Sequence, residues 1–281
     1  MEKFNWKKWP VFNSKHKLAV LEVIESNQLF AAEKVKKFEN AFSKYISSKY
    51  AIGVGNATQG LQLSLHALGI GYGDEVIVTP YSWISSASCV LMQGAIPVFA
   101  DIESDSFGLS PQSIQKAITN RTKAVILVHM FGYPAKINEV LKICEQNSIP
   151  LIEDASHCHG AKFKGRSLGT YGDIGVFSLH QRKALPVGDG GIISTNQKSI
   201  YDNLWRMRSF GHNKLSFNFR MTEFAAALGI VGLEHLNEDN AKRIKNHKIL
   251  ASNLNTEFFN VIEPSEGSFA VFYSNLIEIN L

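Results

Sequence analysis

Cysteine is scarce in this sequence. Only three of the 281 residues are cysteines, and Cys89, Cys144 and Cys158 are widely spaced with no CxxC pair. A disulfide framework or a structural zinc site is therefore not expected, and a reducing compartment is. The first ten residues contain no apolar signal segment, and no window approaches the length of a membrane span, so we expect a soluble cytoplasmic protein.

Clustered charge is also lacking. The formal net charge of +4 is small for this length, and lysine and arginine form no block above the background. Basic pairs such as Lys7 and Lys8 stand among apolar residues, as they do on exposed helix faces. Nucleic-acid binding is therefore not expected, and the 45% hydrophobic content is ordinary for a globular protein.

The sequence lacks the glycine spacing of a dinucleotide-binding loop. Residues Gly53 to Gly60 follow a short apolar strand and open a helix, but their spacing is GxGxxxxG rather than GxGxxG. This segment still offers a helix N-terminus, where unpaired N–H groups and the helix dipole attract an anion, and Thr58 adds a hydroxyl. An ordinary N-cap at Thr58 explains the same pattern at least as well.

Helix and strand patterns alternate from about residue 15 to residue 200. Short apolar runs predict strands, and three- and four-residue apolar steps between them predict helices. Strands this apolar, separated by helices, indicate an α/β fold with a mostly parallel central sheet covered by helices on both faces. In such sheets ligands bind beyond the carboxyl ends of the strands. The predicted strands are 51–54, 75–78, 97–100, 124–128, 150–153 and 175–178, and the predicted helices are 15–28, 33–47, 61–68, 83–93 and 136–147.

The pattern changes after residue 222. Thr222 precedes a run that predicts a helix over 223–236, followed by a second helix over about 239–257 and a strand over 269–281. A single helix and strand bury little surface of their own. We therefore expect residues 1–235 to form a large α/β domain and residues 236–281 to begin a small C-terminal domain that is truncated.

Lys183 is the most informative residue for function. It lies between residues 177–180 and the glycine run 188–191, downstream of an apolar strand that ends in Glu153 and Asp154. A lysine in a glycine-lined pocket can form an imine with a carbonyl, and a carboxylate at a neighbouring strand end can keep a pyridine nitrogen protonated. Together these residues predict a pyridoxal 5′-phosphate site. Taken singly, Lys183 would be a solvated surface lysine and Asp154 a capping or salt-bridging carboxylate.

The other candidate residues each have two interpretations. Ser178 is either a phosphate ligand or a small residue leaving the sheet, and Trp83 either packs in the core or lies flat on a cofactor ring. Asn218 stands just ahead of a predicted helix and could equally cap it. His157 and His159 share a face of an extended segment, but two ligands do not complete a metal site, so no metal is predicted.

A series of motifs follows in order along nearly the whole chain. They are Gly55–Leu61, Gly71–Val78 with Trp83, Gly94–Asp101, Val128–Pro134, Ile152–Ala161, Gly172–Asp173, Phe177–Gly191 and Asn218–Glu223. Together they resemble one family, the DegT/DnrJ/StrS-type sugar aminotransferases, which are pyridoxal phosphate enzymes with the aspartate aminotransferase fold. The resemblance implies a transferase of fold type I with an incomplete small C-terminal domain.

The resemblance also implies a role for each candidate residue. Lys183 is implied to form the imine with the cofactor, and Asp154 to face its pyridine nitrogen. Trp83 is implied to stack on the cofactor ring, and His157 to lie near the ring hydroxyl. The implied phosphate ligands are Ala57, Thr58, Ser178 and, from the other subunit of a homodimer, Asn218.

The sequence departs from the family pattern at several places. The usual GTxA phosphate loop is here Ala57–Gly60, and the usual Gly-Glu-Gly-Gly contains Asp189 instead of glutamate. Many members have glutamine in place of His157, and a histidine there resembles the branch that acts on cyclitols or related carbocyclic ketones. Family members also continue well past the position that matches Leu281.

We therefore expect an aminotransferase that moves an amino group from glutamate or glutamine to a keto group of a nucleotide-linked sugar or a cyclitol. One alternative is a catalytically impaired remnant or a regulatory module that keeps the scaffold. The other is a sugar dehydratase of the same fold. Some relatives with that activity replace the lysine with histidine, and Lys183 argues against it here.

Overall fold

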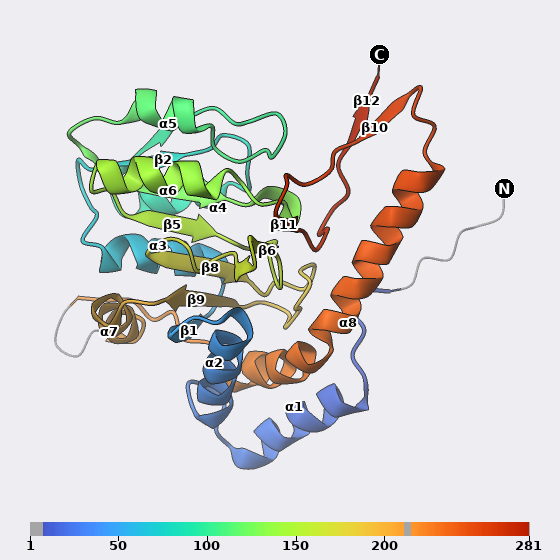
Figure 1. The fold of residues 1–281 in the computed structure, drawn as a ribbon. Helices are drawn as coiled ribbons and strands as arrows, with labels where there is room; N and C mark the ends of the chain where they lie inside the picture. Colours follow the sequence, from blue (N-terminus) through green and yellow to red (C-terminus); the bar gives the residue numbers. More distant parts are fainter. Residues whose placement is uncertain (1–7, 211–214, 281) are drawn as a thin grey trace.

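The computed structural model describes residues 8–210 and 215–280, and its centre is a seven-stranded sheet (Figure 1). The strand order is β1-β9-β8-β5-β4-β2-β3, in which β9 is antiparallel to both neighbours and every other pair is parallel. The strands are β1 (Tyr50–Val54), β2 (Glu75–Val78), β3 (Ile96–Phe99), β4 (Thr122–Val128), β5 (Leu151–Asp154), β8 (Ile174–Ser178) and β9 (Gly191–Thr195). The predicted mostly parallel sheet is confirmed, although the sequence patterns miss β9.

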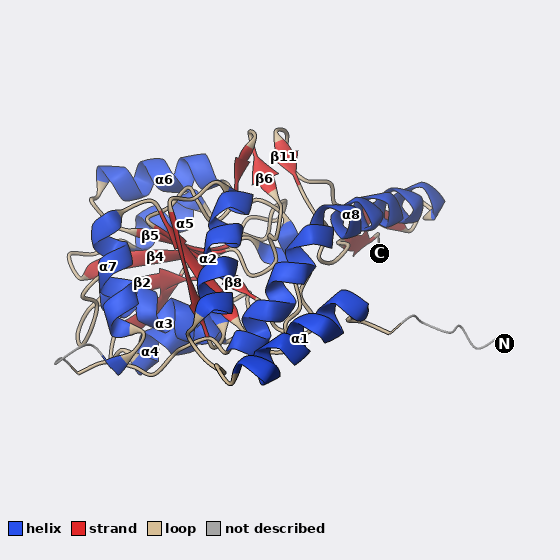
Figure 2. Cartoon of the chain, turned by 90° about the horizontal axis from the view of Figure 1, so that it is seen from below, coloured by secondary structure: helices blue, strands red, loops and turns tan. Residues whose placement is uncertain are grey.

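Helices cover both faces of the sheet (Figure 2). One face packs against α3 (Ala57–Ala67), α4 (Ser85–Met92) and α7 (Lys198–Met207). The other packs against α2 (Glu33–Ile46), α5 (Pro111–Ala117), α6 (Ile137–Gln146) and the start of α8 (Glu223–Asn253), and α1 (Ser14–Ser26) lies on α8. Because side chains alternate along a strand, Ile126 of β4 joins the first core, while Val125 and Leu127 join the second. The predicted covering of both faces is confirmed, although α5 and α7 are missing from the prediction.

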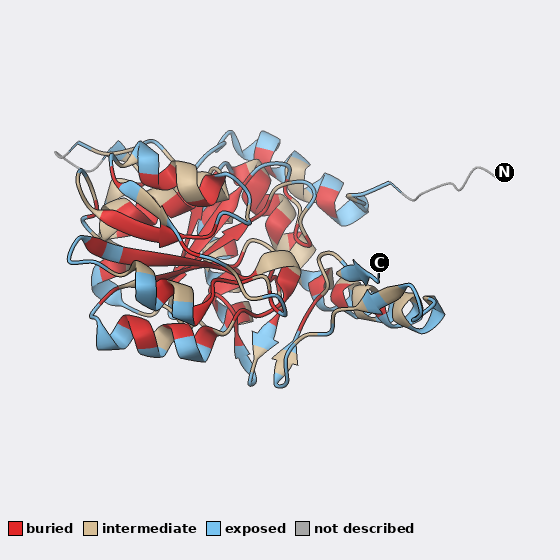
Figure 3. Cartoon of the chain, turned by 90° about the horizontal axis from the view of Figure 1, so that it is seen from above, coloured by how far each residue is buried: buried red, intermediate tan, exposed pale blue. Residues whose placement is uncertain are grey.

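Burial is uneven along the chain (Figure 3). Strands β4, β5 and β8 are buried over almost their whole length, as the apolar runs predict, and so is β9. The end of α8 and the strands after it are mostly exposed. Among the described residues, none of the helices combines the length and the apolarity that a membrane crossing requires.

The prediction was wrong in detail after residue 222. The two predicted helices are one helix, α8, which continues without a break from Glu223 to Asn253, and its second half extends away from the sheet (Figure 1). The predicted strand 269–281 is mostly irregular, because only Ser268–Phe269 (β11) and Ile277–Ile279 (β12) are paired. Strand β11 joins β6 (Lys162–Phe163) and β7 (Arg166–Ser167), and β12 pairs with β10 (Phe259–Val261). The proposed boundary at residue 235 lies inside α8, and a division there stays a proposal.

Candidate active site

The predicted site residues lie where the parallel strands end. Asp154 is the last residue of β5 and Ser178 the last residue of β8, and both strands run in the same direction. Strand β1 ends at Val54, just before α3 begins. Gly191, the first residue of β9, pairs with both Val54 and Ser178, so the ends of β1 and β8 flank it. The sheet thus brings Asp154, Ser178 and the start of α3 to one edge.

Lys183 lies in the connection between β8 and β9. Its backbone N–H donates to the carbonyl of His180 (2.8 Å), and the next two residues, Ala184 and Leu185, are buried in the core. Burial lowers the pKa of Lys183 to about 8, and the negative charge of Asp154 opposes that shift. The Asp154 carboxylate is therefore near enough to the Lys183 amine to influence its charge.

Asp154 is held by neighbours on two sides. Its Oδ1 accepts a hydrogen bond from the backbone N–H of Ser156 (3.1 Å), and its Oδ2 accepts one from the hydroxyl of Ser86 on α4 (3.5 Å). The carboxylate is only 6% exposed. It makes no salt bridge among the described residues, so the alternative of a salt-bridging carboxylate is not supported.

The start of α3 offers an anion site. The N-cap is Asn56, whose side chain accepts from the N–H of Gln59 (2.9 Å), so the alternative in which Thr58 caps the helix was wrong. The N–H groups of Ala57 and Thr58 lie in the first turn, where no intrahelical acceptor exists. The Thr58 hydroxyl is 2.7 Å from that of Ser85. This helix terminus therefore presents backbone donors and hydroxyls to an anion.

Gly191 lets the anion site come close to the sheet. A Cβ atom on Gly191 would lie 2.5 Å from the carbonyl carbon of Asn56 and 2.7 Å from the backbone nitrogen of Ala57. Ser178 of β8 pairs with Gly191, so it lies next to this anion site. Its hydroxyl accepts a hydrogen bond from the N–H of His180 (3.3 Å). Hydroxyls, helix donors and a glycine that admits the backbone together suit a phosphate group.

Trp83 lies in the loop between β2 and α4. Its side chain is 77% exposed, so the alternative that places it in the core was wrong. An exposed aromatic ring at the carboxyl end of a parallel strand is free to stack on a planar ligand.

His157 lies in the loop after β5, beside Lys183. Its Nδ1 accepts a hydrogen bond from the backbone N–H of Phe131 (3.2 Å), so the neutral ring carries its proton on Nε2. Burial, and to a smaller extent the positive charge of Lys183, together lower the pKa of His157 to about 3. The ring is therefore a neutral Nε2–H donor at physiological pH.

His159 differs from His157, although both are buried near Lys183. No described residue forms a hydrogen bond with either ring nitrogen of His159, and burial, the largest cause, lowers its pKa to about 3. Among the described residues no group of three or more potential ligands could hold a metal ion.

Tyr273 is a site residue that the sequence analysis missed. Its ring lies parallel to that of His157, with centroids 4.2 Å apart, and the Lys183 Nζ is 4.7 Å from its centroid. The motifs around Lys183 contain no sign of it, because Tyr273 comes from the irregular segment between β11 and β12.

Asn218 lies at the surface near the start of α3. Its neighbour Phe219 accepts a hydrogen bond from the N–H of Gly55 (3.0 Å), and Asn218 itself is exposed. The alternative role as a helix cap was wrong, because Thr222 caps α8 by accepting from the N–H of Ala225 (3.2 Å). Among residues 8–210 and 215–280, none forms a hydrogen bond with the Asn218 side chain.

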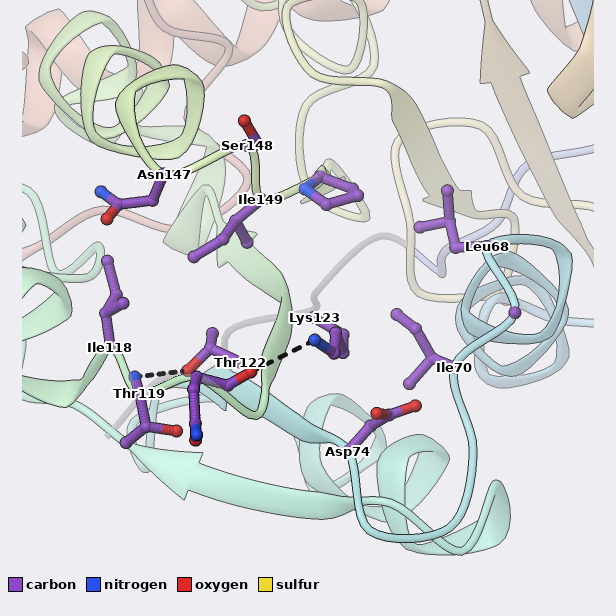
Figure 4. A pocket seen from close by; sticks show the side chains of 13 residues that line it. Leu68, Ile70, Asp74, Ile118, Thr119, Thr122, Lys123, Asn147, Ser148 and Ile149 are labelled. Atoms are coloured by element: carbon purple, nitrogen blue, oxygen red, sulfur yellow. Dashed lines mark hydrogen bonds between the residues drawn. The ribbon is translucent and has the colours of Figure 1, made fainter.

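A separate hollow lies at the opposite edge of the sheet, where β2, β4 and β5 begin (Figure 4). Its polar groups bond mainly to one another: the Lys123 ammonium donates to the carbonyl of Asn120 (3.2 Å), and the N–H of Thr119 donates to the Thr122 hydroxyl (2.9 Å). None of the candidate residues lines it.

Comparison with known proteins agrees with this geometry. Residues 11–275 match the model of the DegT/DnrJ/EryC1/StrS aminotransferase family. The chain is 33% identical over 256 residues to a GDP-perosamine synthase of Escherichia coli O157:H7, covering 88% of this chain and 70% of that protein. It is 34% identical over 212 residues to a GDP-perosamine synthase of Vibrio cholerae, covering 73% of this chain and 58% of that protein. It therefore spans only part of the relatives it matches.

The fold is shared with a solved aminotransferase from Psychrobacter cryohalolentis. That structure superposes with a TM-score of 0.94 at 31% identity, covering 98% of this chain and 77% of the other. The family match extends over most of the sequence and includes all the candidate site residues. The chain therefore belongs to the DegT/DnrJ/EryC1/StrS aminotransferase family, whose members depend on pyridoxal phosphate.

Proposed function

We propose that this protein moves an amino group from glutamate or glutamine to the keto group of a nucleotide-linked sugar. One observation carries the proposal: the mostly buried Lys183 amine lies close enough to the buried Asp154 carboxylate, at the strand ends, for the charge of Asp154 to raise its pKa. The names of the GDP-perosamine synthases support a nucleotide-linked sugar over a cyclitol as substrate.

The residues of this pocket fit pyridoxal phosphate. The N–H groups of Ala57 and Thr58, with the hydroxyls of Thr58 and Ser178, would hold the phosphate in the space that Gly191 leaves open. The Asp154 carboxylate would keep the pyridine nitrogen protonated. When bound, the cofactor supplies an aldehyde carbon and an electron-withdrawing ring.

The ring of the cofactor would have protein groups around it. Trp83 is exposed at a strand end and would stack on the ring, while the Nε2–H of His157 would donate to the ring hydroxyl.

Lys183 would both bind the cofactor and move a proton. With a pKa of about 8, about one amine in ten is neutral at neutral pH, against about one in a thousand for an ordinary lysine. A neutral amine can attack the aldehyde carbon. It can later take the proton from the α-carbon of the amino donor and return it elsewhere, which is general acid–base work.

A homodimer would complete the site. Large apolar side chains are exposed around α4, where Ile84 is 74%, Leu91 62% and Met92 60% exposed, as at a surface that another chain covers. The exposed Asn218 would reach the phosphate held by the other subunit. The three cysteines are free and buried, which supports a reducing compartment such as the cytoplasm.

Cofactor binding tests this proposal. The purified protein with excess pyridoxal phosphate should show an absorbance band at the edge of the visible range, and glutamate should remove it as the cofactor takes up the amino group. The Lys183→Ala variant should show no band, whereas Lys164→Ala, which alters an exposed lysine, should keep it. A wild-type protein without the band rejects the proposal.

The two alternatives predict different results in the same assay. A band that no amino donor changes would identify a catalytically impaired module. Consumption of a keto-deoxysugar without transfer of nitrogen to it would identify a dehydratase.

A further inference from the structure

The segment that carries Tyr273 crosses from the core to the catalytic edge. Ala270 and Val271 are buried, and Val271 packs in the core between α2, α8 and the sheet. On the other side of Tyr273, the N–H of the next residue, Ser274, donates to the carbonyl of Phe131 (3.5 Å). Tyr273 is therefore fixed from both sides.

Phe272 determines the direction in which Tyr273 points. Its backbone is left-handed, with φ of +49°, which is an unfavourable conformation for a bulky side chain. Its ring is stacked on His247 of α8 with centroids 3.6 Å apart, and it lies edge-on to Tyr133 at 5.7 Å. Such a conformation persists when surrounding contacts impose it, and it often occurs near functional sites. With Phe272 turned toward α8, the next side chain faces the pocket.

The ring of Tyr273 forms a wall of the Lys183 pocket. It lies 4.2 Å from the His157 ring with an angle of 9° between the planes, and the Lys183 Nζ is 4.7 Å from its centroid. Tyr273 is half-buried, and burial raises the pKa of its phenol. At physiological pH the residue is therefore a neutral, flat surface against the amine.

We propose that Tyr273 is a positioning residue, which holds the reacting amine of Lys183 and the ring of His157 in fixed orientations. The face of an aromatic ring attracts an ammonium group, and a rigid wall removes much of the rotational freedom of a lysine side chain. The ring also excludes water from the amine. This inference rests on the proposed function, because the orientation matters for attack on the cofactor aldehyde.

Substitutions of Tyr273 in the full chain test this role. Without cofactor, the reactivity of Lys183 toward acetic anhydride can be followed by peptide mass spectrometry as a function of pH. In Tyr273→Ala water reaches the amine. The pH at which half of the Lys183 amine is reactive should therefore rise from about 8 toward the value for an ordinary lysine. The rate of cofactor attachment at high pH should fall about tenfold, because the amine is no longer oriented. Tyr273→Phe keeps the ring, so it should keep the wild-type midpoint and the wild-type rate of attachment.

Two controls separate positioning from a general effect on the fold. Tyr201→Ala removes a comparable ring, which lies 5.5 Å from the exposed Lys198 Nζ, and it should leave the reactivity of Lys183 unchanged. Tyr273→Leu keeps apolar bulk in the segment, and it should still slow attachment about tenfold at high pH because the flat wall is lost.

The result that overturns the inference is a folded Tyr273→Ala or Tyr273→Leu protein with the wild-type attachment rate and the wild-type midpoint. If the wild-type protein does not bind the cofactor, the proposed function fails. The acetylation profile of the cofactor-free protein still reports whether Tyr273 controls the amine, so the two failures are distinguishable.

Discussion

Burial and charge act in opposite directions on the amine of Lys183. Removal from water favours the neutral amine and dominates, while the Asp154 carboxylate favours the ammonium, and the resulting pKa is about 8. The nearby His157 ring is neutral, because both burial and the charge of Lys183 lower its pKa. A reactive amine thus lies among neutral neighbours with one carboxylate nearby.

The rate of cofactor attachment should depend on pH through Lys183. The neutral amine is the nucleophile, so the rate should rise about tenfold per pH unit below a pH of about 8 and level off above it. In Asp154→Asn the opposing charge is gone, so the midpoint should move lower. Stopped-flow absorbance measures the pH dependence of attachment in the wild type and in Asp154→Asn. A wild-type midpoint near the pKa of an exposed lysine would contradict the role of Lys183.

Gly191 should tolerate no side chain. A Cβ atom there would meet backbone atoms of Asn56 and Ala57, which cannot rotate away as a flexible side chain would. We expect Gly191→Ala to lower the free energy of unfolding by about 1–3 kcal/mol and to weaken cofactor binding. Gly71→Ala is the control, because its nearest neighbour would be 4.0 Å from the added carbon. Equal effects of the two changes in urea unfolding would refute the expectation.

At the scale of elements, α2 and α8 are joined by one buried carboxylate. The N-cap of α2, Ala32, has no side chain to bond the first turn. Glu223, the first residue of α8, accepts instead from the N–H groups of Ala32 (2.8 Å), Lys34 (2.7 Å) and Val35 (3.0 Å). A residue about 190 positions away thus supplies the cap, and the two helices hold each other.

Loss of this cap should destabilise the protein. Glu223→Ala leaves one buried and two partly buried donors without this acceptor, so we expect the free energy of unfolding to fall by about 2–3 kcal/mol. Glu223→Gln keeps one acceptor oxygen and should lose less. Glu33→Ala, which alters an exposed carboxylate in the same turn, should cost less than about 1 kcal/mol. An Ala variant that unfolds at the wild-type urea concentration would show that Glu223 is dispensable.

The continuity of α8 has an explanation in its polar residues. Residues around 237–240 suggest a break in the sequence, but these side chains have partners from other elements. Asn237 accepts from the hydroxyl of Tyr45 (2.8 Å), and the buried Asn240 donates to the carbonyl of His159 (2.7 Å). Because tertiary contacts satisfy the polar groups, the helix continues through them.

At the scale of the whole molecule, the proposed homodimer places Asn218 in the site of the partner. Two inactive variants then test the arrangement when mixed. Lys183→Ala and Asn218→Ala subunits should each lack tight, covalent cofactor binding. In a mixed dimer one site carries both changes and the other carries neither, so random pairing should restore about a quarter of the tight sites.

The mixing experiment needs one control, and one outcome would contradict the proposed arrangement. Mixing Lys183→Ala with the double variant Lys183→Ala/Asn218→Ala leaves every site without its lysine, so it should restore nothing. If mixing Lys183→Ala with Asn218→Ala also restores nothing at limiting cofactor, Asn218 acts within its own chain or not at all. Light scattering of the purified protein reports the dimer itself.

The sequence by itself determined the class of fold and the chemistry of the pocket. Apolar runs between periodic helices require a covered, mostly parallel sheet, since only burial on both faces suits them. Lys183, Asp154, Thr58 and Ser178 follow strands or open a helix, so their convergence follows from the rule that such strand ends share one edge.

Tertiary structure alone decided what depends on contacts between distant residues. The antiparallel insertion of β9, the unbroken α8 and the cap from Glu223 each involve a partner more than about a hundred positions away, which local patterns do not record. The same holds for Tyr273. Its segment contains too little regular pairing to show a periodicity, and the stacking of Phe272 on α8 is what turns Tyr273 toward Lys183.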